Sequence, residues 1–113
     1  MDFNLEWVND KDLKALLNRF QKANSAGVHA FFDVDEFEAI IDFYLEGSMF
    51  KEASVAVDIA MEQHPTAIGF NIRFARILGN NKEYYEALEM LNNIELIESA
   101  NIDIYITKAE IYS

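Results

Sequence analysis

The stretch FEAIIDFYLEGSMFKEASVAVDIAMEQHP, residues 37–65, contains two apolar stripes at helical spacing. The residues of the first stripe lie at i, i+3, i+4 and i+7 and so share one face of an α-helix: Phe37, Ile40, Ile41 and Tyr44. Gly47 and Ser48 interrupt the pattern, a second stripe follows over residues 50–60, and Pro65 cannot continue that helix. The stretch therefore predicts two short helices joined by a tight turn.

The same pattern recurs 34 residues further along the chain. A shift of 34 takes Ala53 to Ala87, and the same shift takes Ala75 to Ala109. One helical hairpin cannot bury its own apolar face, whereas hairpins stacked at a fixed period can share a core. The recurrence therefore predicts a helical solenoid, with the small alanines where helices cross.

At this period the chain resembles the tetratricopeptide repeat family, whose helix-turn-helix unit has the same length. The resemblance covers roughly residues 34–113. Its signature positions are filled in three successive units: Phe37, Ile40, Ile41, Tyr44, Phe50, Ala53, Val57, Ala60 and Pro65 in the first; Phe74, Ala75, Leu78, Tyr84, Ala87, Leu91 and Ile94 in the second; Tyr105, Ala109 and Tyr112 in the third. The resemblance implies an all-α fold, a right-handed α-α superhelix with an N-terminal capping helix.

The register divides one domain, residues 1–113, into four consecutive segments. They are an N-terminal extension and capping helix at 1–33, a first repeat at 34–67, a second repeat at 68–101, and the first helix of a third repeat at 102–113. A β-strand competes for the last segment, because Ile102, Ile104 and Ile106 alternate with other residues, but the repeat register favours a helix. The partner helix of the third repeat is missing, so we expect the N-terminal piece of a longer repeat protein.

Local signals place the helix ends and the core. Asp10 is the expected N-cap of a capping helix over residues 11–23, and Gly27 is its expected left-handed residue. Gly79, Asn80 and Asn81 form a turn in the second unit, since all three tolerate left-handed backbone angles. The aromatic residues at register positions are expected in the core, and the remaining one is expected to be exposed: Phe37, Tyr44, Phe50, Phe74, Tyr84, Tyr105 and Tyr112 in the core, and Tyr85 exposed.

Composition restricts the classes of partner. The chain of 113 residues carries 9 basic and 20 acidic side chains, a net charge of −11, and it contains no cysteine. Phosphate backbones repel such a surface, so nucleic acid is not an expected partner. No run of 18 apolar residues or basic leader segment is present, so we expect a cytoplasmic protein that does not bind membranes.

The sequence contains no constellation typical of catalysis, a cofactor or a metal. Asp33, Asp35 and Glu36 are adjacent acids at a helix start, where capping and the helix dipole explain them. His29 and His64 stand apart without zinc-ligand spacing, and His64 is expected to cap the last carbonyls of its helix. Since no nucleophile elbow or glycine-rich phosphate loop is present either, we expect no enzyme activity, no cofactor and no metal site.

The resemblance implies a concave surface formed by the first helices of successive units. The groove positions that it implies are Asp35, Glu38, Asp42, Leu45, Ile72, Arg76, Asp103, Ile106 and Glu110. Glu38 and Asp42 would repel a carboxylate, which argues against a chaperone tail and favours a basic, or mixed apolar and basic, segment. Occupation of the groove by the chain's own N-terminal residues or by later repeats is the competing interpretation.

Two functions follow from this surface. The expected function is a protein–protein interaction module or scaffold that binds a peptide or partner protein without catalysis. The alternative is a regulatory or recognition appendage of an enzyme, or of a larger repeat protein, that continues beyond residue 113. Tyr105, Ile106, Ile111 and Tyr112 lack a polar capping face, so a homodimer through this last helix and coverage by further repeats both stay open.

Overall fold

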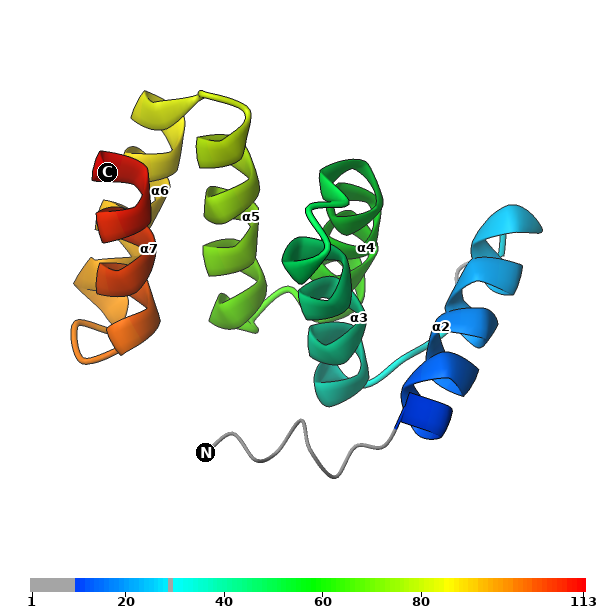
Figure 1. The fold of residues 1–113 in the computed structure, drawn as a ribbon. Helices are drawn as coiled ribbons and strands as arrows, with labels where there is room; N and C mark the ends of the chain where they lie inside the picture. Colours follow the sequence, from blue (N-terminus) through cyan, green and yellow to red (C-terminus); the bar gives the residue numbers. More distant parts are fainter. Residues whose placement is uncertain (1–9, 29) are drawn as a thin grey trace.

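The computed structural model describes residues 10–28 and 30–113, and every regular element in these ranges is an α-helix. The helices are α2 (Asp10–Ser25), α3 (Val34–Glu46), α4 (Phe50–Gln63), α5 (Ile68–Asn80), α6 (Tyr84–Ile97) and α7 (Ile102–Tyr112). Figure 1 shows α5 in the middle, with α3 and α4 on one side and α6 and α7 on the other. The predicted all-α class is therefore confirmed, and the strand considered for residues 102–106 is a helix.

Helix positions recur at intervals of 34 residues. Helices α3, α5 and α7 begin at residues 34, 68 and 102, and helices α4 and α6 begin at residues 50 and 84. The turns recur as well: the Ser48 N–H donates to Leu45 O at 3.0 Å, and the Lys82 N–H donates to Gly79 O at 3.0 Å. The turn between α3 and α4 and the turn between α5 and α6 thus share the same backbone hydrogen bond.

Each turn contains one left-handed residue, Ser48 with φ 57° and Lys82 with φ 68°. The first turn lies at the predicted Gly47-Ser48 pair, whereas the turn predicted at residues 79–81 lies later, at residues 81–82, because α5 continues as helix through Asn80. Neither Ser48 nor Lys82 is a residue that prefers this region, where a side chain costs about 1–2 kcal/mol, so the packing of the flanking helices imposes the conformation.

Two apolar clusters meet at α5. Phe70 and Ile77 of α5 pack with α2, α3 and α4, and Ile72 and Ala75 pack with α6 and α7. A helix that is apolar on more than one face is buried on more than one face, as the sequence of α5 indicated. Ala53 and Ala87, the alanines 34 residues apart, are both fully buried.

The connector between α2 and α3 lies across the end of α4. The ring of Phe32 packs edge-on against Phe20 and Phe37, with centroid distances of 5.8 Å and 5.5 Å. The Gln63 amide donates to Ala30 O at 3.0 Å and accepts from the Phe32 N–H at 3.2 Å. These contacts fasten α2 and its connector to the first helical pair.

The His64 side chain contacts this connector rather than the last carbonyls of α4. Its Nε2 lies 2.8 Å from Phe32 O, while its backbone N–H donates to Ala60 O at 2.8 Å. The prediction that the imidazole caps α4 is therefore wrong, because the connector brings a carbonyl within its reach. His29, the other histidine of the sequence, lies outside the described residues.

Helix α7 packs through a different face from the one its aromatic residues suggested. Ile104 and Thr107 are fully buried against α5 and α6, whereas Tyr105 and Tyr112 are exposed, as is Tyr84 on α6. The prediction that these three tyrosines lie in the core is wrong. The Tyr105 hydroxyl instead donates to Ser99 O at 2.6 Å, at the edge of the helix rather than beneath it.

Candidate functional site

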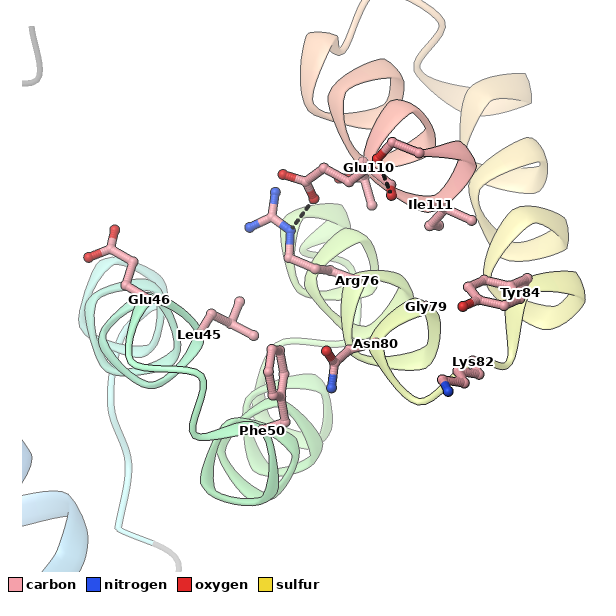
Figure 2. Close-up of a pocket in the computed structure, with 12 residues that line it drawn as sticks. Leu45, Glu46, Phe50, Arg76, Gly79, Asn80, Lys82, Tyr84, Glu110 and Ile111 are labelled. Carbon is pink, nitrogen blue, oxygen red and sulfur yellow. Dashed lines mark hydrogen bonds and ion pairs between the residues drawn. The ribbon is translucent and has the colours of Figure 1, made fainter.

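The candidate site is an inner groove bordered by α3, α5 and α7, and it contains two adjoining hollows. We call the smaller one, of about 220 Å³, the acidic hollow; it is lined by Asp42, Leu45, Glu46, Gly69, Ile72, Arg73, Arg76 and Asp103. We call the larger one, of about 500 Å³, the large hollow (Figure 2); it is lined by Leu45, Glu46, Phe50, Arg76, Gly79, Asn80, Lys82, Tyr84, Thr107, Glu110, Ile111 and Ser113. The hollows share Leu45, Glu46 and Arg76 as a common wall.

Most of the groove residues expected from the sequence lie in these hollows. Six of them line one hollow or both: Asp42, Leu45, Ile72, Arg76, Asp103 and Glu110. Glu38 lies at the border of the groove, with its Oε2 3.8 Å from Arg73 Nη1. Ile106 lines neither hollow and is 45% exposed on α7, and Asp35 is exposed in the first turn of α3.

Arg73 is the residue that sequence reasoning missed. Its Nε donates to Asp42 Oδ1 at 2.8 Å, its Nη2 donates to Asp42 Oδ2 at 3.0 Å, and its Nη1 donates to Gly69 O at 3.2 Å. Burial lowers the pKa of Arg73, but the hydrogen bonds and charge of Asp42, together with Glu38, outweigh burial and raise it. The sequence did contain a signal for Arg73, since it is a charged side chain in a largely apolar helix. A charged side chain in a buried helix needs a partner.

Negative charge still exceeds positive charge at the acidic hollow. Partial burial raises the pKa of Glu38, Arg73 acts in the opposite direction, and the charges of Asp35, Asp42 and Asp103 raise it further. Within residues 10–28 and 30–113, Asp103 and Glu46 form no ion pair. The neighbouring carboxylates, rather than burial, are the part of this shift that favours a positive charge here.

The large hollow differs in its lining. Arg76 Nε donates to Glu110 Oε1 at 3.0 Å across the upper edge, where α5 and α7 approach each other (Figure 2). Leu45 and Phe50 border the hollow on one side, and Tyr84 borders it from α6. With Ile111 of α7, four elements therefore contribute apolar surface to one concavity.

Thr107 contributes an unpaired hydroxyl to the wall of the large hollow. Its side chain is 0% exposed, and its Oγ1 has no hydrogen-bond partner in the described structure. A buried hydroxyl without a partner is unfavourable by about 1–3 kcal/mol. Because Oγ1 is inaccessible from the hollow, this unpaired hydroxyl affects the stability of the fold rather than the binding of a ligand.

Neither a metal-ligand cluster nor a spanning helix is found in the described ranges. No group of three or more His, Cys, Asp or Glu side chains there could hold a metal ion. None of the helices α2 to α7 has the length and apolar character needed to cross a bilayer.

Comparison with known proteins adds no relative. No model of a known family, no curated protein and no solved structure matches the chain. The function therefore has to be inferred from the groove, whose shape, charge and apolar lining are the properties that a ligand meets.

Proposed function

We propose that the protein is a helical-repeat interaction module, similar to tetratricopeptide repeat proteins, that binds a segment of a partner protein in the inner groove. One observation carries this proposal: residues 34 positions apart line the same concavity. Leu45, Gly79 and Ser113 line the large hollow from three successive units, and so do Phe50 and Tyr84 from two. Repeated positions that converge on one groove are typical of helical solenoids that bind extended ligands.

The charge of the groove favours a cationic partner. The groove and its border carry six carboxylates against three cationic groups: Asp35, Glu38, Asp42, Glu46, Asp103 and Glu110 against Arg73, Arg76 and Lys82. Both arginines already pair with acids, Arg73 with Asp42 and Arg76 with Glu110. A carboxylate ligand would find no free cation in the acidic hollow, whereas a lysine or arginine would find unpaired carboxylates.

Selection from a random peptide library displayed on phage, with the full chain as bait, tests this proposal. We expect the selected peptides to be enriched in lysine and arginine and to bind more weakly as salt is raised. Asp103→Lys should abolish their binding, while Glu89→Lys, the same charge change on the exposed side of α6, should leave it unchanged. Failure to enrich any sequence, or equal effects of the two variants, would contradict the proposal.

A second candidate function is self-association through the outer face of α7. Ile102, Tyr105, Ile106 and Tyr112 are all exposed, and three of them follow the i, i+3, i+4 spacing of one helix face. The simplest occupant is a second copy of the chain. Light scattering over a concentration series should then show a dimer mass that returns to one chain in Ile106→Lys; a single-chain mass at every concentration would exclude the homodimer.

A further inference from the structure

The large hollow has the size and lining of a side-chain pocket. Its volume of about 500 Å³ falls in the range of about 300–1,000 Å³ found for ligand sites. Leu45, Phe50, Tyr84 and Ile111 supply apolar surface from α3, α4, α6 and α7. Gly79 lets Ile111 pack closely against α5, since a Cβ at Gly79 would stand 2.9 Å from Ile111 Cγ1.

The charges around this hollow cancel. Glu46 and Glu110 are matched by Arg76 and Lys82. The hollow as a whole therefore offers no net charge to an ion, and its apolar side chains Leu45, Phe50, Tyr84 and Ile111 can contribute to binding by burial of apolar surface. A bulky apolar side chain can occupy this part of the hollow.

The adjoining acidic hollow has the opposite character. Asp42 is already paired with Arg73, but Asp103 is not paired within the described ranges, and Glu46 stands in the wall that the two hollows share. A lysine or arginine entering the acidic hollow can therefore approach Asp103 and Glu46 without breaking an existing ion pair.

We infer that the ligand is an extended, basic-apolar segment of a partner protein, with a bulky apolar side chain in the large hollow and a lysine or arginine two residues away in the acidic hollow. The inference deepens the proposed function and rests on it, since it names the ligand of the same groove. We choose a spacing of two because the hollows share a wall, and i and i+2 are the nearest side chains of an extended chain that point to the same side.

The test uses fluorescein-labelled nonapeptides in a glycine-serine frame, titrated with the full chain and followed by fluorescence anisotropy. The probe carries Lys-Gly-Phe at its centre, and the comparison peptides carry Lys-Gly-Ser, Glu-Gly-Phe or Lys-Phe-Gly. We expect the probe to bind about tenfold more tightly than each comparison peptide. Equal binding of the probe and Lys-Gly-Ser, or of the probe and Lys-Phe-Gly, would overturn the inference.

Protein variants test which hollow holds the apolar side chain of the ligand and which holds the basic one. Tyr84→Ala should weaken the probe about fivefold and leave Lys-Gly-Ser unchanged, whereas Tyr85→Ala, the adjacent exposed tyrosine, should change neither. Asp103→Asn should weaken the probe about fivefold, and Asp58→Asn on the exposed side of α4 should not. Thermal melting of each variant separates loss of binding from loss of fold.

The outcomes also separate this inference from the proposed function. If library-selected peptides depend on Asp103 but do not respond to Tyr84→Ala, the groove binds peptides and the apolar pocket is refuted. If neither the probe nor any selected peptide responds to Asp103→Lys, the proposed function fails together with the inference.

Discussion

Arg73 on α5 and Asp42 on α3 form a two-point ion pair, with Nε to Oδ1 at 2.8 Å and Nη2 to Oδ2 at 3.0 Å. The two residues are 31 positions apart, and the pair joins the first helices of consecutive 34-residue intervals. The Arg73 side chain is only 20% exposed, so water screens the pair less than it screens a surface contact. The same guanidinium also faces Glu38 and thus compensates two acids at the border of the groove.

Replacing Arg73 should destabilise the fold. Arg73→Met removes both hydrogen bonds and leaves Asp42 beside Glu38 without a cation, so we expect a loss of about 2 kcal/mol in the free energy of unfolding. Urea unfolding followed by circular dichroism measures it. Lys51→Met, at an exposed position of α4, is the matched control and should change stability by less than about 0.5 kcal/mol. Equal losses in the two variants would show that the ion pair contributes nothing.

The pKa of Glu38 should make stability depend on pH. Partial burial and three neighbouring acids raise this pKa, so between the ordinary glutamate value and the raised value the folded state binds more protons than the unfolded state. Stability contributed by this group therefore falls as pH rises through that window. Because the Glu38 side chain is 38% exposed, we expect solvent screening to keep the effect below about 1 kcal/mol.

Two measurements check this expectation for Glu38. Urea unfolding across the window should show a decline in wild-type stability that is reduced in Glu38→Gln. Carboxyl NMR titration should place the pKa of Glu38 above the ordinary glutamate value, and Arg73→Met should raise it further. A measured pKa at or below the ordinary value would contradict the expectation.

The unpaired hydroxyl of Thr107 should be a source of instability. Thr107→Val keeps the β-branched shape, so we expect the free energy of unfolding to rise by about 1 kcal/mol. In a domain of this size, that corresponds to an increase in melting temperature of roughly 4 °C. Thr66→Val, in the exposed turn after α4, should move the melting temperature by less than about 1 °C. A lower melting temperature for Thr107→Val would mean that the hydroxyl has a partner in solution.

Gly79 should resist the substitution that usually strengthens a helix. Gly→Ala within a helix ordinarily gains about 1 kcal/mol, but a Cβ at Gly79 would stand 2.9 Å from Ile111 Cγ1 on α7. We therefore expect Gly79→Ala to lose about 1–2 kcal/mol by thermal or urea unfolding, because α7 has to shift. Gly47→Ala, where the nearest atoms lie at 3.5 Å or more, should lose nothing.

A double variant identifies the cause of the loss at Gly79. Ile111→Ala removes the atoms that obstruct the new Cβ, so the losses from Gly79→Ala and Ile111→Ala should be less than additive. Strict additivity would place the strain elsewhere.

Local patterns were sufficient to predict where the helices lie. The stripe over residues 50–60 and the break at Pro65 predicted a helix that the structure has at Phe50–Gln63, and the capping helix predicted at 11–23 is α2, Asp10–Ser25. A helix depends on residues within four positions of each other, together with caps and breakers, and all of these are visible in the sequence. The capping box of Asp33 and Glu36 at the start of α3 is such a local signal.

Only the tertiary structure decided which surfaces meet. It paired Arg73 with Asp42, brought Phe32 O to His64, and buried Ile104 and Thr107 in place of the neighbouring tyrosine face of α7. None of these outcomes follows from spacing along the chain, because the residues that meet come from segments far apart in the sequence. Helical periodicity depends on residues a few positions apart in the sequence. The charge, depth and lining of a groove depend on how separate helices pack against one another.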